Sequence, residues 1–201
     1  MKDKKNITFI QNLFQKKFDL RLDKIPESQN EKEKSADLQL VHDNKVRFVC
    51  ELKTLNYVEL SEETGYVQGE EEGEFWKDGD AAANKIARLI KDAYEQLSKY
   101  SCPKGLIFLN EAFDISEQDY YKAIRGHLPF ADKASGTTTN EYLWHKISDG
   151  KIRDIKKKID FYCWINKKGD EDQIFFDKVT TEGKRVVEKY FAQQRVSGSR
   201  T

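Results

Sequence analysis

Residues 46–55 read VRFVCELKTL, and this stretch decides the fold of the chain. Val and Phe are frequent in β-strands, and side chains along a strand point alternately to its two faces. Glu51 and Lys53 are two residues apart, so they share one face. The apolar residues around them indicate a strand that is mostly buried, where two ionisable groups need a partner or a function.

A second apolar run, residues 36–41, comes just before, and the four residues between the runs, HDNK, are turn-forming. This order predicts an antiparallel hairpin. Asp37 lies opposite Glu51 if the loop holds three residues, 43–45, or if the hairpin contains a β-bulge. A two- or four-residue loop without a bulge would place Glu51 on the other face.

Asp37, Glu51 and Lys53 are a set of groups that phosphodiester hydrolysis can use. The reaction needs a nucleophilic water and a cation that neutralises charge on the phosphate oxygens. Mg²⁺ takes oxygen ligands and is often held by one or two carboxylates. The two carboxylates are therefore the expected metal ligands, and Lys53 is expected to orient the water and contact the phosphate.

The remaining pattern predicts an α/β fold. Gly105 to Leu109 is a short continuous apolar run, as in a central strand that is buried on both faces. Helical periodicity and strand-like runs alternate over the rest of the chain. We expect helices at residues 6–20, from residue 81 to near Cys102-Pro103, at 116–125 and at 181–194, and later strands at 158–165 and 173–177.

The composition indicates one folded domain in a reducing compartment. With 201 residues, 38% hydrophobic and 12% aromatic, the chain can bury a core. We expect a single domain at residues 1–195, with an acidic insertion at 56–80 and a flexible tail at 196–201. Three scattered cysteines favour a cytoplasmic protein. No run approaches the roughly 20 apolar residues that span a bilayer, so no membrane partner is expected.

The charge is unevenly distributed. The net charge is zero, which argues against a protein that coats nucleic acid by charge alone. Residues 59–80 hold nine acidic side chains and one Lys, a net of −8, so the rest of the chain carries +8. A basic body with an acidic insertion can still bind phosphates locally, although a solvated charged surface and a disordered acidic loop would give the same composition.

Ala36-Asp37 followed by Glu51-Leu52-Lys53 resembles the Asp…(Asp/Glu)-x-Lys signature of the PD-(D/E)XK nuclease superfamily. Gln96-Leu97-Ser98-Lys99-Tyr100 is similar to the Gln-x-x-x-Tyr motif of RecB-like nucleases. Gln96 and Tyr100, four residues apart on the expected helix, would share a face. No Pro precedes Asp37, no His lies upstream of it, and three cysteines cannot form a four-thiolate cluster. These departures favour the broad superfamily over the RecB-like subfamily.

The resemblance implies a restriction-endonuclease-like core, with a mixed sheet and an antiparallel motif hairpin flanked by helices. It implies a nuclease that uses Mg²⁺ or Mn²⁺ and acts on nucleic acid, with DNA as the expected partner; superfamily members often dimerise. Asp37, Glu51 and the backbone carbonyl of Leu52 would bind the metal. Lys53 would serve the water, and Gln96 and Tyr100 would support the site.

Two alternatives stay open. The same fold can be a non-catalytic binding or partner module, with the acidic insertion as an interaction or inhibitory element. An unrelated α/β enzyme can also carry Glu51-Leu52-Lys53 by chance. Further metal ligands could come from Gln11 on the first helix or from Glu27, Glu31 and Glu33 in the following link.

Overall fold

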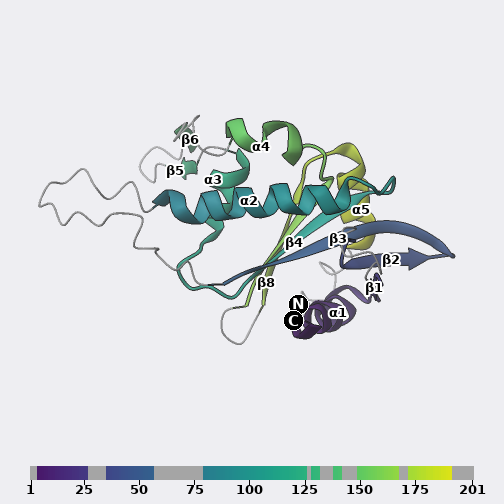
Figure 1. Cartoon of the computed structure of the whole chain (residues 1–201). Helices are drawn as coiled ribbons and strands as arrows, with labels where there is room; N and C mark the ends of the chain where they lie inside the picture. Colours follow the sequence, from purple (N-terminus) through teal and green to yellow (C-terminus); the bar gives the residue numbers. More distant parts are fainter. Residues whose placement is uncertain are drawn as a thin grey trace, which may run out of the picture.

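The structure is a computed structural model that describes residues 4–26, 35–56, 79–125, 128–131, 138–141, 149–167 and 172–191. The described elements form a mixed α/β fold with one six-stranded sheet and a separate two-stranded sheet (Figure 1). The predicted α/β class and mixed sheet are therefore confirmed.

The six-stranded sheet has the order β1-β2-β3-β4-β7-β8. Its three inner strands β3, β4 and β7 are parallel, whereas the remaining neighbours pair antiparallel. The predicted central strand is β4, buried from Gly105 to Asn110. The strands are β1 (Asp23–Lys24), β2 (Leu38–His42), β3 (Lys45–Leu55), β4 (Lys104–Asn110), β7 (Phe161–Asn166) and β8 (Gln173–Lys178).

Helices cover both faces of this sheet. One buried cluster joins α2 (Gly79–Leu97), α3 (Glu117–Arg125) and α4 (Asp149–Lys156) to one face. A second cluster joins α1 (Lys4–Phe18) and α5 (Thr181–Tyr190) to the other face. Figure 1 shows α2 and α1 on opposite sides of the strands. The core therefore has two layers, separated by the sheet.

The alternation along β3 assigns its side chains to these two layers. Phe48 and Cys50 pack in the cluster under α1 and α5, while Val49 and Leu55 pack in the cluster under α2. Glu51 and Lys53 have the same parity as Val49 and Leu55, so they lie on the α2 face. Both faces are buried, which explains why this strand is apolar along most of its length.

The structure adds elements that the sequence pattern did not predict. These are β1, helix α4 and the two-stranded sheet of β5 (Leu128–Ala131) and β6 (Thr138–Glu141). The helix predicted at 116–125 is present as α3. Its start is fixed by Asp119, whose carboxylate accepts hydrogen bonds from the Ser116 amide and hydroxyl, both at 2.8 Å.

Several predicted boundaries are wrong. Helix α2 begins at Gly79, inside the range expected for the insertion, and ends at Leu97 rather than near Cys102-Pro103. Helix α1 ends at Phe18, because Asp19 takes the left-handed conformation (φ 54°) that closes a helix. Most of the expected acidic insertion, residues 57–78, and the expected tail lie outside the described residues. In the described part, no helix is long and apolar enough to cross a bilayer.

Candidate active site

The hairpin of β2 and β3 has a two-residue loop and a β-bulge. Asp43 and Asn44 form the loop with φ of 53° and 57°, a left-handed conformation that Asp and Asn tolerate and that matches strand twist. The register shifts between Leu40 and Val41, and Arg47 is the extra residue on β3. The prediction of either a three-residue loop or a bulge is thus confirmed through the bulge.

The bulge sets the register at the open end of the hairpin. Leu38 pairs with Cys50, so the next position places Asp37 opposite Glu51. The Asp37 amide donates to the Cys50 carbonyl at 3.0 Å. Without the bulge, a two-residue loop would pair Asp37 with Cys50 and move Glu51 to the other face. The two carboxylates therefore lie on one face, as the metal-site hypothesis requires.

The Asp37 side chain takes part in the end of the strand ladder. Its Oδ2 accepts a hydrogen bond from the Leu52 amide at 3.0 Å, in the place of a backbone carbonyl. This contact fixes the Asp37 carboxylate in an orientation along β3. This contact uses the backbone amide of Leu52. That the Leu52 carbonyl binds a metal stays a prediction.

Glu51 and Lys53 form an ion pair on the α2 face. Lys53 Nζ lies 3.0 Å from Glu51 Oε1, with side-chain exposures of 17% and 1%. Leu106 and Phe108, both fully buried, are their register partners on β4. Attraction between the charges is strong in such an apolar setting, and it offsets part of the cost of removing them from water. Lys53 keeps partial access to solvent.

Two buried cysteines near the site, Cys50 and Cys163, have raised pKa values. Burial is the main cause that raises the pKa of Cys50, followed by Cys102 and by the charges of Glu51 and Asp37. Burial also raises the pKa of Cys163 well above its usual value. Both side chains are therefore neutral thiols at neutral pH, and they pack as small apolar groups.

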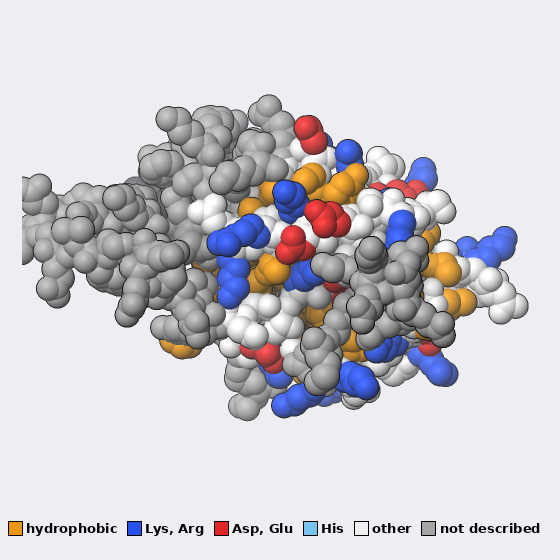
Figure 2. Space-filling view, in the orientation of Figure 1, with side chains coloured by type: hydrophobic (Ala, Val, Ile, Leu, Met, Phe, Trp, Pro, Cys, Tyr) orange, Lys and Arg blue, Asp and Glu red, His pale blue; other side chains and the backbone are white. Residues whose placement is uncertain are grey.

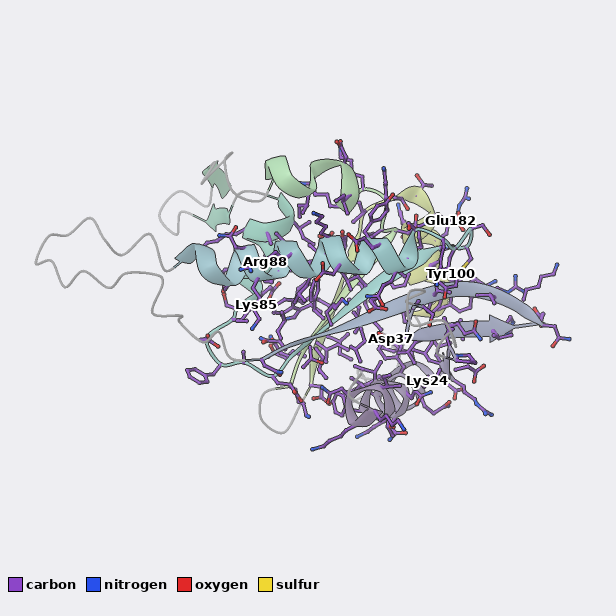
Figure 3. All side chains as sticks on the ribbon, in the orientation of Figure 1. Lys24, Asp37, Lys85, Arg88, Tyr100 and Glu182 are labelled. Atoms are coloured by element: carbon purple, nitrogen blue, oxygen red, sulfur yellow. The ribbon has the colours of Figure 1, made fainter. Side chains whose placement is uncertain are left out.

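Two further contacts hold the backbone around Asp37. The Ile25 amide, just after β1, donates to the Asp37 carbonyl at 2.9 Å. The Ala36 amide donates to the Tyr100 hydroxyl at 3.3 Å. Figure 3 shows Asp37 beside β2 and Tyr100 near the C-terminal end of α2. Tyr100 thus fixes the segment that leads into Asp37.

The prediction that Gln96 and Tyr100 share one helix face is wrong. Helix α2 ends at Leu97, and Tyr100 follows a turn in which its amide donates to the Leu97 carbonyl at 3.1 Å. Gln96 is 4% exposed; its Nε2 donates weakly to the Asp92 carbonyl at 3.5 Å. Its Oε1 is buried with no hydrogen bond among the described residues. Among the described residues no hydrogen bond joins Gln96 to either carboxylate, so its role stays a prediction.

The donor set fits a hard divalent cation. One oxygen of each carboxylate, Asp37 Oδ1 and Glu51 Oε2, is buried outside any hydrogen bond among the described residues, while the other oxygen of each is engaged. Carboxylate oxygens are the ligands that Mg²⁺ and Mn²⁺ prefer. No group of three or more His, Cys, Asp or Glu side chains that could hold a metal occurs within the described ranges. A two-carboxylate site leaves the remaining positions to water and substrate.

No other candidate ligand among the described residues joins this site. Gln11 donates to the Leu22 carbonyl at 2.8 Å, so the suggestion that it adds a metal ligand is not supported. His42 is exposed at the tip of the hairpin. Glu27, Glu31 and Glu33 lie outside the described residues. No signal in the sequence pointed to Ile25 as an anchor of Asp37.

Comparison with protein-family models, curated proteins and solved structures found no match to this chain.

Proposed function

We propose that the chain is a metal-dependent nuclease of the PD-(D/E)XK type, which hydrolyses phosphodiester bonds of nucleic acid, with DNA as the expected substrate. The observation that carries the proposal is the bulged hairpin, which places Asp37 opposite Glu51 and pairs Glu51 with Lys53. A restriction-endonuclease-like core is supported by the element order α1, hairpin, α2, β4 and by the parallel pairing of β3 with β4.

Asp37 and Glu51 would hold Mg²⁺ or Mn²⁺ through their buried oxygens. When bound, such a cation lowers the pKa of water and neutralises charge on phosphate oxygens. The Leu52 amide holds Asp37 in place through Oδ2, and the Ala36 and Ile25 amides hold its backbone. These contacts pre-orient the carboxylate, so that little reorganisation is needed when a cation binds.

Lys53 has two tasks in this proposal. Its ammonium donates to Glu51 Oε1, and this contact fixes the end of a long flexible side chain. An ammonium has three protons to donate, so the remaining ones can hold a water molecule and an oxygen of the scissile phosphate. Lys53 therefore orients the attacking water and stabilises charge that grows on the phosphate.

The test is a cleavage assay with purified protein in Mg²⁺ or Mn²⁺. The panel contains linear, circular, branched and single-stranded DNA and RNA. We expect cleavage that EDTA abolishes and that falls at least about 100-fold in Glu51→Ala and in Lys53→Ala, since both groups act at the reacting atoms. The matched controls Glu95→Ala and Lys91→Ala change exposed charges on α2 and should leave the rate unchanged. Cleavage that survives Glu51→Ala and Lys53→Ala would refute the assignment.

A further inference from the structure

A pair of basic side chains lies on α2 away from the candidate site. Lys85 and Arg88 are one helical turn apart, and Figure 3 shows them on the N-terminal half of the helix, while Tyr100 and Asp37 lie toward its C-terminal end. Figure 2 shows blue side chains side by side over this part of α2. Neither residue is used by the proposed hydrolysis.

The position of Lys85 relative to β3 is fixed by a hydrogen bond. Its Nζ donates to the Asn56 carbonyl at 2.8 Å, just after the last residue of β3. Asn56 is three residues beyond Lys53, which corresponds to roughly 10 Å along a strand. Lys85 therefore marks a point on the same face of the sheet, roughly 10 Å from the backbone of Lys53.

The geometry of α2 indicates that one flank of the helix runs along β3. Gln96 follows Lys85 by eleven residues, or roughly 16 Å along the axis, and three turns bring it back to the same flank. Tyr100, just past the end of the helix, contacts Ala36 beside Asp37. One flank of α2 therefore runs beside β3, with Lys85 and Arg88 at one end and the hairpin contact at the other.

The local charge of this flank favours an anion. Arg88 is exposed and forms no ion pair with any described residue, although Asp92 lies one turn further on. Lys85 and Arg88 are three residues apart, a spacing at which like charges destabilise a helix by a few tenths of a kcal/mol. A phosphate would relieve this repulsion, and a guanidinium can bind two phosphate oxygens at once.

We propose that Lys85 and Arg88 bind a backbone phosphate of the substrate strand, within about three nucleotides of the phosphate that Lys53 contacts. The roughly 10 Å separation and the 3.4 Å axial rise per nucleotide set this upper limit, because phosphates of one strand lie farther apart than their axial rise. The inference rests on the proposed nuclease function, since it names the second point at which that site holds its substrate. The contact carries no sequence preference, because phosphates are common to every nucleotide.

The first experiment measures binding without cleavage. Fluorescein-labelled DNA and RNA oligonucleotides of one sequence are titrated with the full chain in EDTA, and anisotropy is followed over a range of salt concentrations. We expect Arg88→Ala to weaken binding and to lower the slope of log K against log salt by about 0.7–0.9, the loss of one phosphate contact. Lys85→Met, which keeps the apolar stem, should do the same, and the double variant should bind about tenfold more weakly.

Lys91→Ala is the matched control, because it removes the same charge from an exposed position of α2. It should change affinity less than about twofold. Thermal unfolding checks each variant. If Lys85→Met does not fold because the Asn56 contact is lost, Arg88→Ala alone decides the result. Equal affinity of Arg88→Ala and the unchanged chain would overturn the proposal, as would the absence of binding to every oligonucleotide.

The second experiment locates the phosphate. Neutral methylphosphonate linkages are placed one at a time on each side of the mapped cleavage position. One linkage, within about three nucleotides on one side, should weaken binding by the unchanged chain but not by Arg88→Ala. An equal penalty in both proteins would overturn the assignment. If the chain cleaves nucleic acid but Arg88→Ala does not change binding, only the phosphate contact is rejected. If binding depends on Arg88 but no cleavage occurs, only the nuclease function is rejected.

Discussion

The two faces of the central sheet are built from the same strands but are occupied very differently. Toward α1 and α5, aromatic rings pack edge to face and face to face; Phe176 and Phe191 stack with centroids 4.5 Å apart. The buried amide of Asn6 on this face is satisfied by Thr54 at 3.0 Å. Toward α2, aromatic rings also pack, and Trp164 and Phe175 stack with centroids 6.1 Å apart. This second face, however, also buries the carboxylates of Asp37 and Glu51, so it accepts a cost in stability to keep charges in place.

The largest expected effect is on stability and lies on the face covered by α1 and α5. Phe161 is 1% exposed and its ring contacts Phe48 and Phe191. Phe161→Ala should lower the free energy of unfolding by about 3–5 kcal/mol, because the cavity left in packed rings cannot collapse. Urea unfolding measures this change. Phe113→Ala is the control, at a side chain that is 78% exposed, and should stay within about 0.5 kcal/mol. Similar losses in both variants would remove the contrast between packed and exposed rings.

The second prediction compares Glu51→Gln with the double variant Glu51→Gln, Lys53→Met on the α2 face. Glu51→Gln leaves the Lys53 ammonium at 17% exposure without its ion-pair partner, and should lower the free energy of unfolding by about 1–3 kcal/mol. The double variant Glu51→Gln with Lys53→Met should recover most of this loss, since both charges are then removed.

Both variants should lack cleavage activity, although the double variant should regain most of the lost stability. Stability and activity would then change independently on this face. Urea unfolding and the cleavage assay are run on the same preparations. A double variant that is less stable than Glu51→Gln would show that the ion pair stabilises the fold rather than the site.

The smallest expected effect concerns the anchor of Asp37. Tyr100→Phe removes the acceptor of the Ala36 amide and should lower the free energy of unfolding by about 1 kcal/mol. It should also raise the Mn²⁺ concentration needed for half-maximal cleavage, because Asp37 is held less firmly. Tyr94→Phe removes a hydroxyl from α2 and serves as control. An unchanged Mn²⁺ requirement would limit Tyr100 to a structural contact.

The sequence predicted those parts of the fold that depend on side-chain periodicity. The alternating and continuous apolar runs located β3 and β4, and the 3.6-residue period located α1, α2 and α3. The boundary of α2 was missed because Ser98 and Lys99 can continue a helix as well as end one. Strand β1 has only two residues and is held by pairing with β2, so it leaves no periodic signal.

The site was predicted in part for a related reason. The pattern identified Asp37, Glu51 and Lys53. It left one question open, namely which hairpin loop or bulge sets the register between Asp37 and Glu51. Whether Asp43 and Asn44 form a two-residue loop with a bulge at Arg47 depends on backbone conformations that several residues tolerate. The contact of Tyr100 with Ala36 joins residues 64 positions apart, and only the packing of α2 beside the hairpin brings it about.

The bulge at Arg47 also determines how the hairpin can change in length during evolution. Between Arg47 and the open end, residues 38–40 pair in regular register with residues 48–50. Deletion of Arg47 would shorten β3 by one residue and remove the bulge, and these pairs would stay intact. Insertions and deletions at the tip can therefore accumulate without moving the carboxylates. A single insertion between Phe48 and Glu51 would instead exchange the two sides of the strand and carry Glu51 into the layer under α1 and α5. Length variation among descendants of this chain is therefore expected at the tip and forbidden nearer the site.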